Sequence, residues 1–198
     1  MLDKNLRKHS SEFRRYLHNN QYEVTDKGIE FARASAVAQG MYFHDVNGED
    51  EQCSPNNITD EGLIYLLSVG LNNGTKLATW YLALYAGNYT PTADLTAASF
   101  PATAGEITSN TEGYTETTRR VWTPTAPTTP LIDNLANKAA FTIATASSLT
   151  INGAALVSDA TKGAVTGKLV SATKFAAART MYNTDVFNLA YRVQLTST

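Results

Sequence analysis

Glu112 and Glu116 are the residues of this chain whose type and spacing most resemble an acid–base pair. Residues four apart in an extended strand lie on the same face, so both carboxylates would project together, with Arg119 and Arg120 nearby. Two carboxylates on one face can act as general acid and general base. The same cluster also forms cross-strand or intersubunit ion pairs, and we favour that structural role.

Other residues that could do chemistry are few. The three histidines, His9, His18 and His44, have no metal-ligand spacing, and the single Cys53 excludes a disulfide framework and a cysteine metal site. A Ser/His/Asp triad assembled from distant segments stays open, although no Gly-x-Ser-x-Gly elbow is present. No glycine-rich nucleotide loop occurs. We therefore expect a protein that is not an enzyme and that has no catalytic, metal or cofactor site.

The acidic stretch HDVNGEDEQCSPNN, residues 44–57, superficially resembles a calcium loop. Its glycine, Gly48, is misplaced for an EF-hand, and Asn56 stands where the twelfth-position Glu would be. We predict an ordinary solvated loop here, with a calcium site as the alternative.

Four aromatic residues raise the alternative of a carbohydrate-binding face, because aromatic rings stack on sugars: Trp80, Tyr81, Tyr114 and Trp122. The alternation in LATWYLALYAG, residues 77–87, makes both faces of that segment apolar. This pattern favours a strand that is buried on both sides.

The composition suits a chain that is covered by other chains. Of the 198 residues, 43% are apolar and only 17% are charged, with a net charge of −2. Thr, Ser, Asn and Ala must therefore fill much of the surface. The basic residues of segment 1–18 are too sparse for the stripe that nucleic-acid binding needs, so we do not expect a nucleic-acid partner. No apolar run is long enough for a secretory signal or a membrane span, so we expect no membrane association.

Residues 3–18 have the pattern of an amphipathic helix, with apolar side chains on one face and basic groups on the other. We predict that this segment binds a neighbouring protein. Its candidate contact residues are Leu6, Arg7, Phe13, Arg14, Arg15, Tyr16 and Leu17.

Two further helices are predicted in the first third of the chain. Thr25 is a candidate N-cap for a short helix over residues 29–38, and Thr59 for a clearer one over residues 60–69 that Gly70 ends. The second has more than one apolar stripe, so we expect it to be substantially buried.

After residue 72, short alternating segments separated by turns predict strands at 113–122, 139–146, 148–158, 167–175 and 185–197. The fold class is therefore mainly β, a β-sandwich or jelly-roll domain preceded by a helical N-terminal segment. We predict a helical attachment arm at residues 1–45 and a β-sandwich domain at residues 46–198, which helix 60–69 opens.

The run NNITDEGLIYLLSVGLNNGTKLATWYLALYAGNYTPTADLTAASF, with GEITSNTEGYTETTRRVWTP, KAAFTIATASSLTINGAALVS and GKLVSATKF, resembles structural proteins of tailed-bacteriophage virions. Within that group the resemblance is to head decoration, or cement, proteins. It covers residues 56–198, and its motifs are structural.

The resemblance implies a β-rich module that binds and stabilises the assembled shell. Its expected partners are the major capsid protein or neck and portal-proximal virion proteins, with assembly into a homo-oligomer such as a trimer. Its expected location is the outer surface of the head or neck of a virion assembled in the bacterial cytoplasm. The alternative is a neck, tail or fibre-adaptor protein of the same virion.

Overall fold

We analysed a computed structural model of the chain, which describes residues 22–25, 28–31 and 36–197. The chain divides into two compact units, Met1–Val37 with Ser197–Thr198, and Ala38–Thr196. The predicted helix over residues 3–18, with its contact residues, lies outside the described residues and stays a prediction.

In the first unit, strands β1 (Tyr22–Thr25) and β2 (Gly28–Phe31) form an antiparallel hairpin whose closing pair is Thr25 with Gly28. The predicted helix over residues 29–38 is therefore wrong. Its first residues belong to β2, and its last belong to β3, which begins at Ala36. A short apolar run fits the helical and the strand period equally, and here cross-strand pairing decides.

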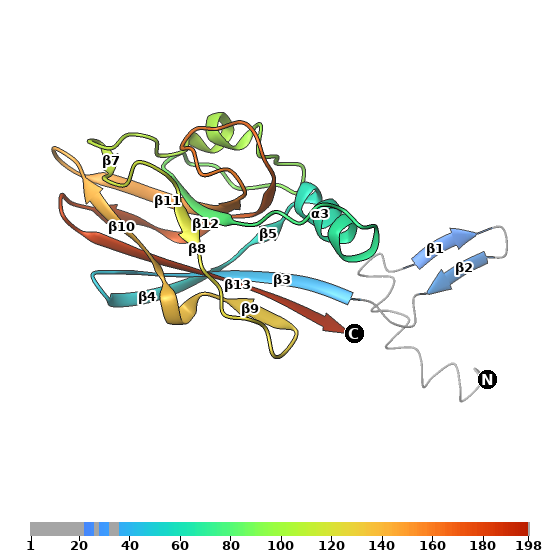
Figure 1. Cartoon of the computed structure of the whole chain (residues 1–198). Helices are drawn as coiled ribbons and strands as arrows, with labels where there is room; N and C mark the ends of the chain where they lie inside the picture. Colours follow the sequence, from blue (N-terminus) through green and yellow to red (C-terminus); the bar gives the residue numbers. More distant parts are fainter. Residues whose placement is uncertain (1–21, 26–27, 32–35, 198) are drawn as a thin grey trace, which may run out of the picture. The chain divides into compact units, whose positions relative to one another are not determined.

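The second unit contains two antiparallel sheets packed as a sandwich (Figure 1). The chain is mainly β, as predicted. The first sheet has six strands in the order β4-β3-β13-β10-β7, with β9 paired to β13. These strands are β3 (Ala36–Val46), β4 (Glu49–Pro55), β7 (Gly113–Tyr114), β9 (Leu131–Asp133), β10 (Ala139–Ala144) and β13 (Val186–Ser197).

The second sheet has five strands in the order β5-β12-β11-β6-β8. These strands are β5 (Asn57–Ile58), β6 (Trp80–Tyr85), β8 (Arg120–Trp122), β11 (Leu149–Val157) and β12 (Leu169–Met181). A helix, α3 (Asp60–Leu71), follows β5, and short π-helical and 3-10 turns lie at Pro101–Gly105 and Leu135–Asn137.

The acidic stretch 44–57 is mostly a β-hairpin, so the prediction of a solvated loop is wrong. β3 and β4 pair across a turn at Asn47 and Gly48, whose φ angles are 55° and 84°. Two consecutive positive φ angles are typical of an Asn-Gly hairpin turn. β3 also crosses the predicted boundary between residues 45 and 46, and the division into arm and domain stays a prediction.

β6 is buried on both faces, as predicted. Leu82 and Leu84 contribute to the core between the two sheets, whereas Ala83 and Tyr85 contribute to a second cluster. Residues from the connection after β6, including Phe100, complete that second cluster. In Figure 1 this connection, drawn in green, lies over the sheet.

The predicted strand over residues 113–122 is instead two short strands in different sheets, β7 and β8. Neither strand includes Glu112 or Glu116, and between the strands Arg119 forms a buried ion pair with Glu106. Glu112 and Glu116 therefore do not share one strand face.

Candidate interaction surface

Glu112 and Glu116 accept hydrogen bonds from backbone amides and threonine hydroxyls of β10 and the turn after it. Glu112 accepts hydrogen bonds from the Thr145 hydroxyl (2.7 Å) and the Ala146 amide (3.1 Å). Glu116 accepts one from the Thr142 amide (3.2 Å). Both carboxylates thus tie loop 112–116 to β10. They form no ion pair with another described residue of the chain, so the cross-strand ion pair is wrong, and the intersubunit ion pair stays a prediction.

The buried ion pair of this region joins Arg119 to Glu106, and sequence inspection missed it. The guanidinium donates Nε and Nη2 to the two carboxylate oxygens, each at 2.7 Å, and both side chains are almost fully buried. Its other N–H groups reach the carbonyls of Asp159 (3.0 Å) and Ala164 (3.2 Å). This network secures the loop between β11 and β12 to the 106–119 connection.

The four aromatic residues considered for carbohydrate binding do not form one exposed face. Tyr114 is fully buried and Trp122 is 9% exposed, and both belong to the core between the sheets. The indole of Trp122 donates to the Tyr191 carbonyl at 3.2 Å. Trp80 packs edge-on against Tyr65 of α3, with 5.2 Å between the ring centroids. These rings serve the fold.

His44 lies buried in β3 between Phe175 and Phe187, with ring centroids 4.0 and 5.5 Å away. Its Nδ1 accepts a hydrogen bond from Arg179 Nε at 3.2 Å, and Arg179 also pairs with Asp50. Burial first, and then the guanidinium of Arg179, lowers the pKa of His44 to about 4. The imidazole is therefore neutral at physiological pH and acts as an acceptor within the sandwich.

Lys162 is a partly buried lysine with an altered acidity. Its Nζ lies 3.5 Å above the ring of Tyr114 and donates to Asn110 Oδ1 (2.7 Å) and the Tyr114 carbonyl (2.9 Å). Burial lowers the pKa of Lys162 to about 8. The ammonium is held by these contacts in the loop between β11 and β12.

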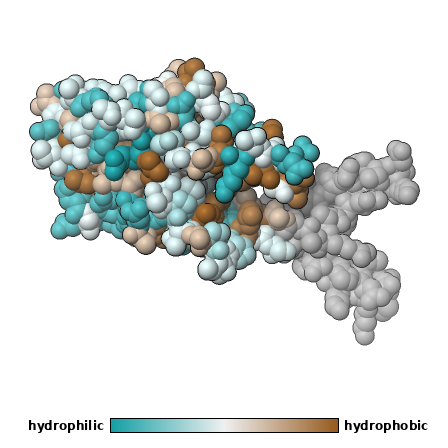
Figure 2. Space-filling view, in the orientation of Figure 1, coloured by the Kyte–Doolittle hydropathy of each residue, from teal (hydrophilic) through white to brown (hydrophobic). Residues whose placement is uncertain are grey.

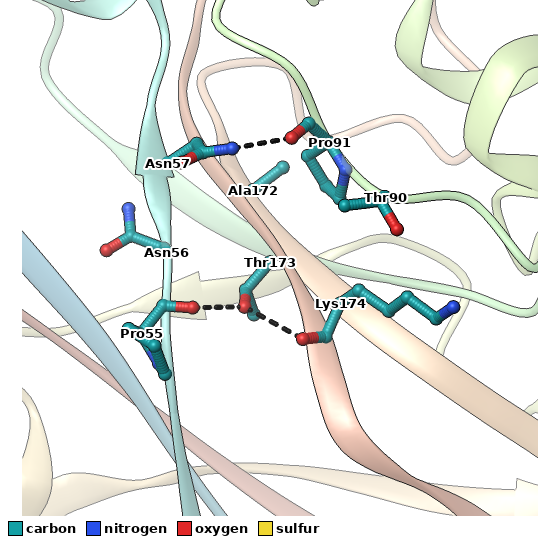
Figure 3. Close-up of a pocket in the computed structure, with 8 residues that line it drawn as sticks. All are labelled: Pro55, Asn56, Asn57, Thr90, Pro91, Ala172, Thr173 and Lys174. Atoms are coloured by element: carbon teal, nitrogen blue, oxygen red, sulfur yellow. Dashed lines mark hydrogen bonds between the residues drawn. The ribbon is translucent and has the colours of Figure 1, made fainter.

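One shallow pocket, of about 180 Å³, lies where β5, β12 and the 90–91 segment meet (Figure 3). Asn57 donates to the Pro91 carbonyl at 2.5 Å, and the Thr173 hydroxyl donates to the Pro55 carbonyl at 2.6 Å. Figure 3 shows these bonds spanning the elements that line the pocket. The volume of this pocket is below the usual range of small-molecule sites. The polar groups that line it join elements of the fold to one another.

Helix α3 begins where the sequence predicted. The hydroxyl of Thr59 accepts from the Gly62 amide at 3.1 Å and donates to the Leu169 carbonyl of β12 at 2.6 Å. Glu61, in the first turn, accepts from the amides of Ala97 (2.9 Å) and Leu169 (2.8 Å). One side of the helix is therefore fixed to the second sheet through its first turn.

The other side of α3 is exposed and apolar, so the prediction of a substantially buried helix is wrong. Only Gly62 is buried in this helix. The exposed apolar face, as we call it, consists of Leu63, Ile64, Leu66, Leu67 and Leu71. Their exposed fractions are 38, 67, 42, 60 and 84% respectively. In Figure 2 hydrophobic residues gather over the α3 end of the body.

An open groove of about 600 Å³ runs beside the exposed apolar face, between α3 and the 94–96 segment. Its lining combines Ile64 and Tyr65 with the carboxylates of Asp60, Glu61 and Asp94. Lys168 also lines the groove and pairs with Glu61 at 3.5 Å. This surface has the composition of a protein-binding site, an apolar centre with a charged rim.

The sequence pattern predicted this helix but not the exposure of its apolar side chains. Apolar residues on several sides of a helix are the usual signal of burial. Here the small Gly62 lets the first turn approach β12 closely, and the larger residues point away from the sandwich. Two features of the sequence were the available signals of this exposure: a small residue on the side of the helix that contacts β12, and the low charge of the whole chain.

Comparisons with protein-family models and with curated proteins gave no match to this chain. Within the described ranges, no three His, Cys, Asp or Glu side chains gather as a metal-binding group. None of the helices that the structure describes has the length and hydropathy of a membrane span. The function is therefore argued from the surface of the molecule and from the sequence.

Proposed function

We propose that this chain is a structural protein of a tailed-bacteriophage virion, a decoration or cement protein that binds the assembled capsid shell and stabilises it. The resemblance of residues 56–198 to such proteins motivates the proposal. The low content of charged residues and the two-sheet sandwich are compatible with it.

The observation that carries the proposal is the exposed apolar face of α3. Monomeric soluble proteins rarely leave large contiguous apolar patches in water, and such patches commonly mark protein interfaces. Here five large apolar side chains share one short helix, whose opposite side is fixed to the second sheet. A rigid apolar patch of this kind suits a protein that acts by binding other chains in an assembly.

Stabilisation of a shell would follow from mass action. A protein that binds only the assembled state at 100 times its Kd stabilises each site by about 2.7 kcal/mol. Repetition over many equivalent sites would make the particle much harder to open. In this role the arm, with the contact residues predicted between Leu6 and Leu17, would engage a shell subunit.

The copy number in purified virions tests the proposal. We expect quantitative mass spectrometry to find this chain at a copy number comparable with that of the major shell protein. Particles stripped of it should lose their genome at a lower temperature, and adding the purified chain back should restore the original temperature. Absence of the chain from washed particles would refute any virion role.

The neck, tail or fibre-adaptor role is the second candidate. The helix predicted over residues 3–18 favours it, because such a segment could act as a docking peg with the sandwich as a spacer. A copy number of only one or a few rings per particle would support this role and exclude decoration. The jelly-roll topology and the helical arm remain predictions that an experimental structure of the bound protein would test.

A further inference from the structure

We propose that two copies of this chain pair through the exposed apolar face of α3, with the two helices antiparallel around a two-fold axis near Leu67. The pairing rests on the exposed face and on the position of the charges around it. It needs no second protein, so it is tested with the purified chain alone.

The most exposed residues of the helix form a continuous seam. Ile64, Leu67 and Leu71 are 67, 60 and 84% exposed, and they follow one another at intervals of three and four residues. This is the a/d spacing by which two helices interlock side chains along a shared seam. Leu63, which is 38% exposed, flanks the seam, whereas Leu66, 42% exposed, lies about 130° around the helix from it.

The orientation of the seam is fixed by contacts on the opposite side of α3. A Cβ on Gly62 would meet the backbone of Val170 at 2.5 Å, so the helix lies directly against β12. Thr59 and Glu61 bond to the Leu169 carbonyl and amide. The seam is therefore presented on a rigid element, which lowers the entropic cost of association.

The area is sufficient for a small dimer interface. The five residues of the exposed apolar face together expose roughly 500 Å² per copy, which is at the upper end for the largest patch of a monomer. Two copies that cover each other completely would remove at most roughly 1,000 Å² from water, which is about the lower limit for a specific interface. The groove beside the helix offers further surface for contact.

The charges favour the antiparallel arrangement. Asp60 stands at the N-terminal end of the seam and is exposed, with no ion pair among the described residues. A parallel pair would bring the two Asp60 carboxylates together and align the helix dipoles. In an antiparallel pair centred on Leu67, the two Asp60 residues lie roughly 20 Å apart along the axis, since each helical residue rises 1.5 Å. Ile64 of each copy then lies at the level of Gly70 of the other, beside Leu71.

A charge within the seam should separate the copies. We expect sedimentation equilibrium of the full chain to show a dimer, and Leu67→Glu to weaken dimerisation at least 100-fold. Leu67 is 60% exposed, so the variant should fold, which circular dichroism and thermal melting would verify. Val165→Glu is the matched control, because Val165 is 58% exposed in the loop between β11 and β12 and should leave the dimer unchanged.

Cysteine cross-linking tests the two-fold geometry in a Cys53→Ser background, which removes the exposed free thiol. Leu67→Cys should form an intermolecular disulfide on mild oxidation, because residue 67 faces itself across the axis. Asp60→Cys should not, because a disulfide requires Cα atoms within about 7 Å.

Three outcomes would overturn the proposal. The first is a monomer at every concentration tested. The second is an oligomer that Leu67→Glu leaves intact, including one that disappears only when residues 1–20 are removed, since the arm would then make the contact. The third is efficient cross-linking through Asp60→Cys without cross-linking through Leu67→Cys, which would place the helices side by side in another arrangement.

Discussion

At the scale of single residues, His44 gives the sandwich a defined pH dependence. The unfolded chain takes up a proton on His44 as the pH falls through 6.5, whereas the folded chain does so only near its lowered pKa of about 4. The stability that depends on the neutral imidazole is therefore fully present above pH 6.5 and is lost as the pH falls from 6.5 to 4. The uptake of one proton by the unfolded chain lowers the free energy of unfolding by about 1.4 kcal/mol per pH unit, or by about 3 kcal/mol between pH 6.5 and 4.

The groups that face His44 set the limits of this effect. Arg179 and Lys138 lower its pKa, and Asp45 and Asp50 raise it. Both aspartates have pKa values below their ordinary 3.8, so they titrate below the window. We expect His44→Gln to reduce the pH dependence of the free energy of unfolding by the amount that one proton contributes. Urea unfolding at pH 4 to 7 measures this dependence. An unchanged dependence would mean that His44 is not the group responsible.

Removing only the arginine of the buried Arg119–Glu106 ion pair should destabilise the protein. Arg119→Met leaves the Glu106 carboxylate buried without its cation, so we expect a loss of about 3–5 kcal/mol in the free energy of unfolding. Lys168→Met is the matched control, because Lys168 is 48% exposed and pairs with Glu61 at 3.5 Å. That exposed pair should contribute at most about 1 kcal/mol. Equal losses by urea denaturation would contradict the structural role of the Arg119–Glu106 pair.

At the scale of elements, alternation predicted the strands that are buried on at least one face. The segments assigned as β10, β11, β12 and β13 all emerged near their predicted positions. The cap of α3 was also predicted, because a Thr-Asp pair before a glycine is a local signal.

Elements that depend on distant partners were not predictable in the same way. The division of residues 113–122 between two sheets goes with pairing to distant strands, because β7 pairs with β10 and β8 pairs with β6. The hairpin of β3 and β4 was hidden by its acidic composition, although Asn47-Gly48 is a recognised turn signal. The exposure of α3 depends on which side of the helix meets β12, and within the helix only the small Gly62 marks that side.

Two glycines of α3 should respond oppositely to the same substitution. Gly62→Ala places a methyl group 2.5 Å from the Val170 carbonyl oxygen, so we expect it to destabilise the protein by about 1–3 kcal/mol. Gly70 has no atom within 4 Å of an added Cβ, so Gly70→Ala should stabilise the helix by about 0.5–1 kcal/mol.

Urea unfolding of both variants tests whether the two substitutions change the free energy of unfolding in opposite directions. A low protein concentration is used, because association contributes least there. Stabilisation by Gly62→Ala would show that α3 does not lie against β12 in solution.

At the scale of the whole molecule, charge is largely satisfied within the sandwich while apolar surface is left outside it. Asp45 and Glu51 share Lys138, Asp50 pairs with Arg179, and Asp133 pairs with Arg192. The large apolar side chains of α3 have no comparable cover. A neighbour over this helix would remove that surface from water, and the proposed dimer would supply one without using the arm.

In the proposed function the arm attaches the protein to the particle, and removing the arm tests this proposal. Residues Ala38–Thr196 form a compact unit with both sheets and both apolar clusters, so deleting residues 1–20 should leave the unfolding midpoint in urea nearly unchanged. The deletion should abolish binding to phage particles, because it removes the contact residues between Leu6 and Leu17.

Co-sedimentation with particles measures that binding, and the full-length chain with Arg7, Arg14 and Arg15 changed to Gln is the control. If the arm binds by burying its apolar face with charges at the rim, this variant should bind more weakly and with less dependence on salt, but not lose binding entirely. A truncated chain that still decorates particles at full occupancy would assign attachment to the sandwich. The exposed helix would then serve the particle directly, and a Leu67→Glu variant that dimerises normally yet fails to bind would identify it as the contact.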